Sequence, residues 1–215
     1  MENCGRPLTL VPEALYSQIE ELKFPEIYIE NSYMAEEVRY NMPWYGSHSF
    51  LNEYIRKNNC KRIMEIGVLD GDNARRMIEV AIQNFPPDEV EYYGFDFFIG
   101  STPQQVGQKL ERTGCKFELF KGDTIDTLPK AVKTLPKMDL IFIDGGKSFT
   151  EARSDWENSK TLIHDETAVF VHNYEFSGVR RMVDSISKNM YQVKIIHPPS
   201  EGDTALIKKR HGSKE

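Results

Sequence analysis

The sequence predicts an α/β domain built on one seven-stranded, mostly parallel sheet. From about residue 60 onward, short apolar runs alternate with segments of helical period, which is typical of parallel strands joined by crossover helices. Only "PPSEGD" separates the last two apolar runs, and it is too short for a crossover helix, so these runs should form an antiparallel hairpin. The 215 residues suffice to bury one ordinary core without disulfides or structural metals.

The strands are expected at the seven apolar runs. In chain order these runs are residues 61–67, 90–98, 116–122, 138–144, 167–173, 191–197 and 204–209. Apart from the closing hairpin, they should pair in parallel, because segments of helical period connect them.

The helices are expected where apolar residues recur on one helical face. The clearest such face follows the first strand and comprises Ala74, Met77, Ile78, Ala81, Ile82 and Phe85. Weaker faces comprise Val106 and Leu110; Phe149, Ala152, Trp156 and Ile163; and Val179, Met182, Val183 and Ile186. A further helix, carrying Phe50, Leu51, Tyr54 and Ile55, precedes the first strand.

Residues 1–46 are expected to form an extension to the main domain of residues 47–210. One predicted helix face there carries Leu15, Ile19 and Leu22, and an aromatic segment, "YNMPWYGSHSF", follows it. The aromatic side chains could pack on the sheet, cover an acceptor pocket as a lid, or form the interface of a homodimer. Residues 211–215 are expected to be a solvated tail.

Composition restricts the class of partner and the compartment. The net charge of −6 and the pI near 5.5 argue against binding to nucleic acid or to an anionic membrane surface. The three cysteines form no metal-binding motif, so we interpret them as reduced thiols. The N-terminus lacks the features of an export signal, and no run approaches 18 apolar residues. We therefore expect a cytoplasmic protein that acts on a small molecule.

The turn after the first strand carries two glycines and several carboxylates. Gly67 and Gly71 bracket this turn and would leave space for a nucleoside. Asp72 either caps the following helix, which is the favoured interpretation, or contacts a ligand. A dinucleotide-binding turn would read GxGxxG, but the third glycine is absent here, and Glu65, Asp70 and Asp72 would repel phosphate. A ligand with ribose hydroxyls and a cationic centre fits better.

The next three strands also end in carboxylates. Asp96 follows the second strand and could accept hydrogen bonds from both hydroxyls of a ribose. Asp123 follows the third strand and could reach an adenine amino group, although Asp123 or Thr124 could simply cap the next helix. Asp144 follows the fourth strand. Because parallel strands end at one edge of a sheet, these carboxylates should gather there.

With these motifs, the sequence resembles the class I S-adenosylmethionine-dependent methyltransferases over roughly residues 47–210. "MEIGVLDG" is similar to their first motif, "YGFDFF" to their acidic ribose-binding strand end, and "KGDTIDTL" to their third motif. The resemblance implies a Rossmann-like sheet of order 3-2-1-4-5-7-6, with helices on both faces and the last strand antiparallel. It also implies a binding site for S-adenosylmethionine formed by Glu65, Gly67, Val68, Gly71, Asp72, Asp96, Phe97, Asp123, Thr124 and Asp144.

The fourth and fifth strands resemble two branches of small-molecule O-methyltransferases at once. "IDGGKSF" and "VFVHNYE" are similar to the IDGxHSY and HDY segments of the methyltransferase-24 branch, and to the DxxK and DN segments of the catechol type. The catechol alignment implies that Lys147 and Asp144 are catalytic, and that Asp144, His172 and Asn173 are metal ligands. Because His172 replaces an aspartate, the set favours a transition metal over magnesium, or no metal.

These observations predict transfer of a methyl group from S-adenosylmethionine to a hydroxyl of a small molecule. Lys147 would remove or attract the hydroxyl proton. Two alternatives stay open: Lys147 could be a solvated lysine at a helix start, and His172 an ordinary strand-end histidine. The altered motif also leaves open a non-catalytic protein that binds S-adenosylmethionine. The glycine pattern and the terminal hairpin disfavour an NAD-dependent dehydrogenase.

Overall fold

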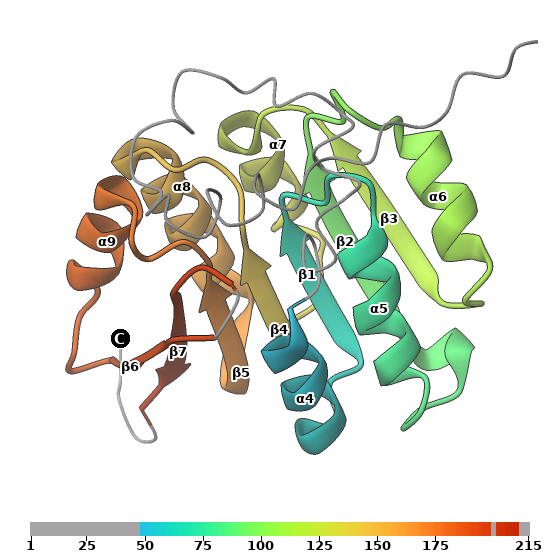
Figure 1. Ribbon diagram of the computed structural model, residues 1–215, viewed down its shortest axis with the longest axis horizontal. Coiled ribbons are helices and arrows are strands. Elements are labelled where there is room, and N and C mark those ends of the chain that lie inside the picture. Colours follow the sequence, from blue (N-terminus) through green and yellow to red (C-terminus); the bar gives the residue numbers. More distant parts are fainter. Residues whose placement is uncertain (1–47, 199–200, 211–215) are drawn as a thin grey trace, which may run out of the picture. The chain divides into compact units, whose positions relative to one another are not determined.

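The computed structural model describes residues 48–198 and 201–210 (Figure 1). Its helices are α4 (Ser49–Asn58), α5 (Asp72–Ala81), α6 (Pro103–Glu111), α7 (Thr124–Ala131), α8 (Phe149–Ser159) and α9 (Ser177–Asp184), with short 3-10 helices at Pro87–Glu89 and Lys160–Leu162. Its strands are β1 (Arg62–Ile66), β2 (Glu91–Asp96), β3 (Lys116–Lys121), β4 (Met138–Ile143), β5 (Ile163–Val171), β6 (Tyr191–Ile196) and β7 (Thr204–Lys209). The predicted extension, its helix and the tail lie outside the described residues.

All seven predicted strands are present, and they form one sheet of order β3-β2-β1-β4-β5-β7-β6. Strands β1 to β5 are parallel to one another, whereas β7 is antiparallel to both β5 and β6. This topology confirms the predicted strand order and the closing hairpin. In such a sheet, ligands bind at the carboxyl edge, near the point where the order reverses between β1 and β4.

Some predicted boundaries were wrong, since α5 ends at Ala81 and α9 at Asp184, before the expected Ile82, Phe85 and Ile186. Ile163 was expected on the apolar face of the helix that carries Trp156, but it is the first residue of β5 and pairs with Met138. The helix ends at Ser159, and the register of β4 and β5 shifts between Met138 and Leu140. A β-branched residue is well suited to that strand position, although its spacing from Trp156 also matches a helix.

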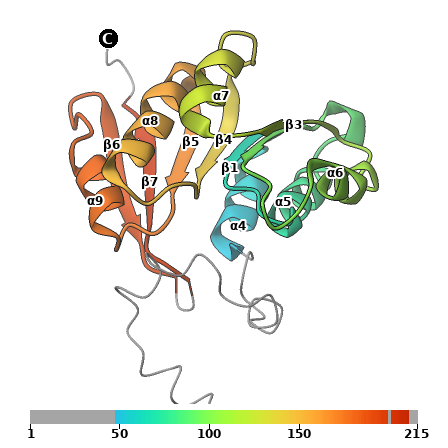
Figure 2. The ribbon, with the colours of Figure 1, turned by 90° about the horizontal axis from the view of Figure 1, so that it is seen from above.

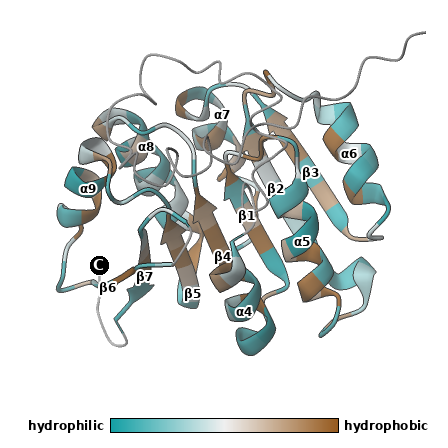
Figure 3. Cartoon of the chain, in the orientation of Figure 1, coloured by the Kyte–Doolittle hydropathy of each residue, from teal (hydrophilic) through white to brown (hydrophobic). Residues whose placement is uncertain are grey.

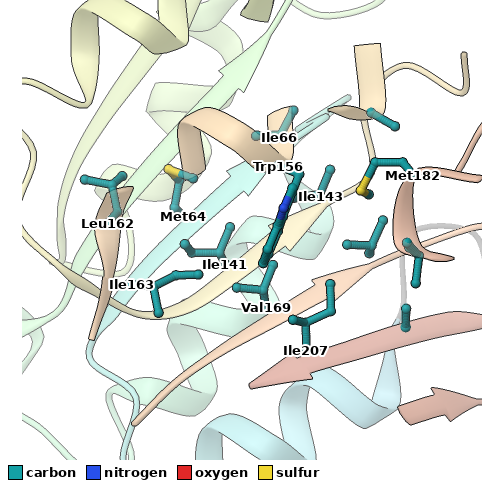
Figure 4. Close-up of a cluster of buried hydrophobic side chains, with 14 of the residues drawn as sticks. Met64, Ile66, Ile141, Ile143, Trp156, Leu162, Ile163, Val169, Met182 and Ile207 are labelled. Carbon is teal, nitrogen blue, oxygen red and sulfur yellow. The ribbon is translucent and has the colours of Figure 1, made fainter. Parts of the chain in front are cut away.

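The helices cover both faces of the sheet, as predicted. Helices α4, α5 and α6 pack on one face, and α7, α8 and α9 pack on the other (Figure 2). Along β1 the side chains alternate between the two cores: Ile63 joins the first, and Met64 and Ile66 join the second, around Trp156 (Figure 4). Because both faces of the central strands are buried, most of their residues are hydrophobic, most clearly in β4 and in the second half of β5 (Figure 3).

Within the described part of the chain, no helix combines the length and the apolar character that crossing a bilayer requires.

The two cysteines that the structure describes, Cys60 and Cys115, are buried free thiols. Burial raises the pKa of Cys60 to about 12, so this thiol is protonated and unreactive at neutral pH.

Asp155 is a buried carboxylate on α8 with 0% exposure. Within the described residues, neither of its oxygens has a hydrogen-bond partner of normal geometry. Burial raises the pKa of Asp155 from 3.8 to about 6, and the nearby Thr124 hydroxyl opposes this rise only in part. The folded state therefore binds a proton that the unfolded state releases, and the corresponding stability is lost as the pH rises from about 4 through about 6.

We expect Asp155→Asn to gain stability relative to the wild type as the pH rises. Between pH 5 and pH 8, the difference in the free energy of unfolding should grow by about 1 to 2 kcal/mol in favour of the variant. Urea denaturation at the two pH values measures this difference. Asp126→Asn, at an exposed position on α7, is the control for removing a carboxyl group that is not buried. An Asp155→Asn difference that does not change with pH would contradict the assignment.

Candidate active site

Gly67 ends β1 in a conformation that brings β1 and β4 together. Its φ is +92°, and a Cβ at this position would lie 2.4 Å from the carbonyl oxygen of Asp144. The Gly67 N–H donates to the carbonyl of Phe95 at 2.8 Å, which ties the same turn to β2. The space that this glycine leaves free is therefore filled by the backbone of Asp144. Gly71 has a φ of +79°, and a Cβ there would lie 2.7 Å from the Val106 side chain.

The expectation that Asp72 caps α5 was wrong. Gly71 occupies the N-cap position in a left-handed conformation, which shifts Asp72 into the first turn. The Asp72 N–H donates to Asp70 Oδ1 at 3.0 Å, and its carboxylate accepts from Lys109 Nζ at 2.7 Å. A carboxylate in the first turn still interacts favourably with the helix dipole.

Glu65 lies inside the protein with 1% exposure. Its carboxyl oxygens are engaged by Asn73 Nδ2, at 2.7 Å, and by the hydroxyl of Tyr92. Burial raises the pKa of Glu65 to about 8, so the group is mostly protonated at neutral pH. The protonated group carries no charge that would repel phosphate. The repulsion expected from Glu65 is therefore absent, and only that expected from Asp70 and Asp72 is left. Val68, also expected near the cofactor, has 2% exposure and packs in the core beneath α5.

Asp96 is held at the carboxyl end of β2 by two backbone groups. Its Oδ2 accepts from the Leu69 N–H at 2.9 Å, and its Oδ1 accepts from the Phe98 N–H at 2.5 Å. Each oxygen keeps a second lone pair for a ligand. The next residue, Phe97, is 52% exposed, which is unusual for a phenylalanine in a well-packed domain.

Asp123 caps α7, which is one of the two roles that the sequence suggested for it, the other being contact with an adenine amino group. Its Oδ1 accepts from the Ile125 N–H at 2.9 Å, and Thr124 is the first residue of the helix. Ile125 is 42% exposed at the same edge of the sheet. The carboxyl ends of the neighbouring strands β2 and β3 thus present Phe97 and Ile125 beside Asp96 and Asp123.

Asp144 and Lys147 form an ion pair directly after β4. Lys147 Nζ donates to Asp144 Oδ1 at 2.5 Å. Burial favours the neutral form of Asp144, but the charge of Lys147, joined by those of His172 and His48 when they are protonated, outweighs it and holds the pKa of Asp144 below its usual value. The carboxylate is therefore ionised at neutral pH.

The backbone around Lys147 is held from both sides. Ser148 and Glu151 form a capping box that begins α8 immediately after Lys147. On the other side, a Cβ at Gly178 of α9 would lie 2.3 Å from the Lys147 carbonyl oxygen. This packing fixes the point from which the lysine side chain extends to Asp144.

His172 follows β5 and is 8% exposed. Its Nδ1 lies 2.9 Å from Thr204 Oγ1, and that hydroxyl donates its only proton to the Gly202 carbonyl at 3.2 Å. With the hydroxyl proton directed at that carbonyl, the hydroxyl accepts a hydrogen bond from Nδ1–H, and in this tautomer the lone pair of the imidazole is on Nε2. Burial lowers the pKa of His172 to about 4, so the ring is neutral at pH 7.

His48, which sequence reasoning missed, lies beside His172. The two ring centroids are 4.7 Å apart, and His48 is 7% exposed. His48 Nδ1 lies 2.9 Å from Glu201 Oε2, and a carboxylate can only accept, so Nδ1 is the donor. The lone pair of a neutral His48 is then on Nε2, as in His172. No motif or spacing in the sequence relates His48 to residues about a hundred positions away.

His48, Asp144 and His172 form a cluster whose possible ligand atoms all lie within 4.8 Å of one another. The structure thus brings together two of the three predicted metal ligands and adds His48. The third predicted ligand, Asn173, has a left-handed backbone with a φ of +58°, and its amide donates to Glu175 Oε1 at 3.4 Å.

Comparison with known proteins gives one family and one fold. The family model "Methyltransferase domain" matches residues 64–174, which is more than half of the chain. The search of curated proteins found no match. Among solved structures, the O-methyltransferase TomG from Streptomyces achromogenes, in complex with SAM, matches with a TM-score of 0.64 at 16% identity, over 91% of this chain and 94% of its own.

Two further solved structures are similar. An O-methyltransferase from Bacillus cereus, in complex with SAH, matches with a TM-score of 0.62 at 14% identity, over 92% of this chain and 97% of its own. CalS11, a TDP-rhamnose 3'-O-methyltransferase, matches with a TM-score of 0.63 at 16% identity, over 93% and 92% of the two chains. At such identities, the likeness shows the shared fold.

Proposed function

Since the chain belongs to the methyltransferase domain family, we propose that it transfers the methyl group of S-adenosylmethionine to a hydroxyl of a small molecule. The observation that carries the proposal is the family match over residues 64–174, which include the glycine turn, Asp96 and the pair of Asp144 and Lys147. TomG and the Bacillus cereus enzyme, which share the fold, were solved with SAM and SAH. CalS11 acts on a sugar hydroxyl, as its description states, which supports a small-molecule acceptor.

The cofactor is proposed to lie along the carboxyl edge of β1, β2 and β3. Asp96 would accept hydrogen bonds from the ribose hydroxyls, since both its oxygens are oriented by backbone N–H groups and keep free lone pairs. The exposed side chains of Phe97 and Ile125 would contact the adenine ring, which favours apolar surfaces. The second oxygen of Asp123 would accept from the adenine amino group while the first caps α7.

The acceptor is proposed to lie beside Asp144 and Lys147. The sulfonium methyl is already activated, so the protein must align the acceptor oxygen with it and take up the hydroxyl proton. In the ion pair with Asp144 the lysine carries its proton, so it would first release that proton to solvent. As the carbon–sulfur bond then breaks and the carbon–oxygen bond forms, the hydroxyl proton would pass to the neutral Lys147 Nζ, leaving S-adenosylhomocysteine and the methyl ether. Asp144 would hold the lysine in position through their ion pair.

We expect Asp96→Ala to bind S-adenosylhomocysteine about 5- to 150-fold more weakly than the wild type. The reason is the loss of a charged hydrogen-bond partner, worth on the order of 1 to 3 kcal/mol. Isothermal titration calorimetry measures the affinity, and thermal unfolding reports whether the β2 end is still folded. Asp126→Ala, at an exposed position on α7, is the control and should bind normally. Equal affinity in Asp96→Ala and the wild type would remove Asp96 from the cofactor site.

A non-catalytic protein that binds the cofactor is the second candidate function. It is favoured by one observation, the neutral and buried imidazole of His172 where the catechol-type pattern has an aspartate. Binding of S-adenosylhomocysteine without methyl transfer to any hydroxyl in a panel of sugars and phenols would support it. Methyl transfer to any of them would refute it.

We further propose a cytoplasmic location. The buried free thiols Cys60 and Cys115 support a reducing compartment. Dimerisation through residues 1–46 remains a prediction, and analytical ultracentrifugation of the full chain against a chain lacking these residues would test it.

A further inference from the structure

The cluster of His48, Asp144 and His172 offers two imidazole nitrogens and one carboxylate to a ligand. Magnesium prefers an octahedral shell of oxygen ligands and usually one or two carboxylates, so this set fits magnesium poorly. Imidazole nitrogen and carboxylate oxygen together suit divalent transition metals, zinc above all. We propose that this cluster binds a divalent transition-metal ion of the zinc class through the Nε2 atoms of both histidines and the carboxylate of Asp144.

The hydrogen bonds around the cluster support metal binding. In metal sites, a histidine ligand donates its second ring N–H to a carboxylate, carbonyl or hydroxyl, which fixes the tautomer and the ring orientation. Both histidines have such a partner here: Nδ1 of His48 lies 2.9 Å from Glu201 Oε2, and Nδ1 of His172 lies 2.9 Å from Thr204 Oγ1. Both rings are also buried before any ion binds, at 7% and 8% exposure, so little ordering would be required.

The rings are also fixed by packing. His48 lies against Phe142, with ring centroids 4.8 Å apart, and against the edge of His172. Gly202 leaves room for the His172 ring, since a Cβ there would lie 3.2 Å from its Cε1. Two imidazoles that neither pair with each other nor face solvent are otherwise costly to bury, and a shared cation would satisfy both lone pairs.

The local charges allow a cation. Lys147 repels it, but Lys147 is bonded to Oδ1 of Asp144, which leaves Oδ2 for the metal. Asp144 and Glu201 contribute two negative charges against the one positive charge of Lys147. Three protein ligands leave a coordination position open, and an ion there would act as a Lewis acid toward an oxygen ligand. This role in methyl transfer rests on the proposed function, whereas binding of the metal does not.

The test measures metal binding by the full chain without turnover. The protein is dialysed against a chelator, and zinc, cobalt and magnesium are titrated by calorimetry, with the visible spectrum of the cobalt form as a second readout. We expect one zinc or cobalt ion per chain, visible cobalt absorption that zinc abolishes, and much weaker binding of magnesium. Magnesium binding as tight as zinc binding, or no zinc binding, would overturn the proposal.

Variants separate this site from adventitious binding to surface histidines. Glu201→Gln keeps the shape of the residue that orients His48 and should weaken zinc binding by about 10- to 100-fold. His48→Gln and His172→Gln should weaken it at least as much. His197→Ala is the matched control, because His197 lies on the same hairpin but is exposed and bonded to Asp203. If His197→Ala removed the zinc and the other variants kept it, the proposal would be wrong.

Titration with S-adenosylhomocysteine on the same samples distinguishes the two proposals. A chain that binds S-adenosylhomocysteine but no zinc would refute the metal site alone. A chain that binds one zinc ion in this cluster but no S-adenosylhomocysteine would refute the proposed function and leave the metal site supported. Thermal unfolding of each variant identifies any loss of binding that comes from misfolding, and Glu201→Gln, which truncates no side chain, then decides the outcome.

Discussion

Replacing Lys147 with methionine is expected to lower kcat for methyl transfer by about 100-fold or more. Methionine retains the length of the side chain but cannot accept a proton, and it leaves the carboxylate of Asp144 without its ion-pair partner. Because Asp96 and the β2 end are unaffected, the affinity for S-adenosylhomocysteine should stay close to that of the wild type. Steady-state kinetics and calorimetry measure the two quantities.

Lys147→Arg tests whether the lysine acts by charge or by proton transfer. Arginine keeps the positive charge and can still pair with Asp144, but it does not deprotonate in proteins. If Lys147 accepts the proton, both variants should lose a similar large factor. If its charge alone matters, Lys147→Arg should retain most of the rate. A near-normal rate in Lys147→Met would remove Lys147 from the mechanism.

Gly67→Ala is expected to reduce the free energy of unfolding by about 2 to 5 kcal/mol. The left-handed conformation of residue 67 disfavours any side chain, and the new Cβ would lie 2.4 Å from a backbone oxygen that cannot rotate away. Urea denaturation gives the loss directly. The same clash would displace Asp144, so activity should fall even at temperatures where the variant stays folded.

Gly100→Ala is the matched control for this prediction. Gly100 follows β2 in an open loop, and no atom lies within 4 Å of a Cβ placed there. Its stability should change by less than about 0.5 kcal/mol, as is usual for surface substitutions. If Gly67→Ala were as stable as Gly100→Ala, the close approach of β1 and β4 would have no energetic importance.

Most of the fold could be predicted from the sequence because its signals are local. Strands buried on both faces are mostly apolar, and the six residues between the last two predicted strands exclude a crossover helix. Ile163 was misassigned because its spacing from Trp156 satisfies a helix as well as a strand. Only its pairing with Met138 distinguishes the two, and that contact joins residues 25 positions apart.

The candidate site was predicted less completely because its decisive features are contacts between distant segments. The gathering of the residues that follow β1 to β4 could be anticipated, since parallel strands end at the same edge of a sheet. His48 could not, because it joins Asp144 and His172 only after the start of α4 packs beside Phe142 of β4. The protonation of Glu65 was also missed, since it depends on complete burial beside Tyr92 and Asn73. The cap of α5 was misassigned by one residue because Gly71 adopts a left-handed conformation.

The closing hairpin has an evolutionary consequence. The groups proposed to hold the cofactor lie on β1, β2 and β3, whereas the groups that orient both histidines, Glu201 and Thr204, belong to the connection between β6 and β7 and to the first residue of β7. These parts are far apart in the chain and at different positions in the sheet. Substitutions in the hairpin can therefore change how the two histidines are oriented while the residues at the ends of β1, β2 and β3 are inherited unchanged.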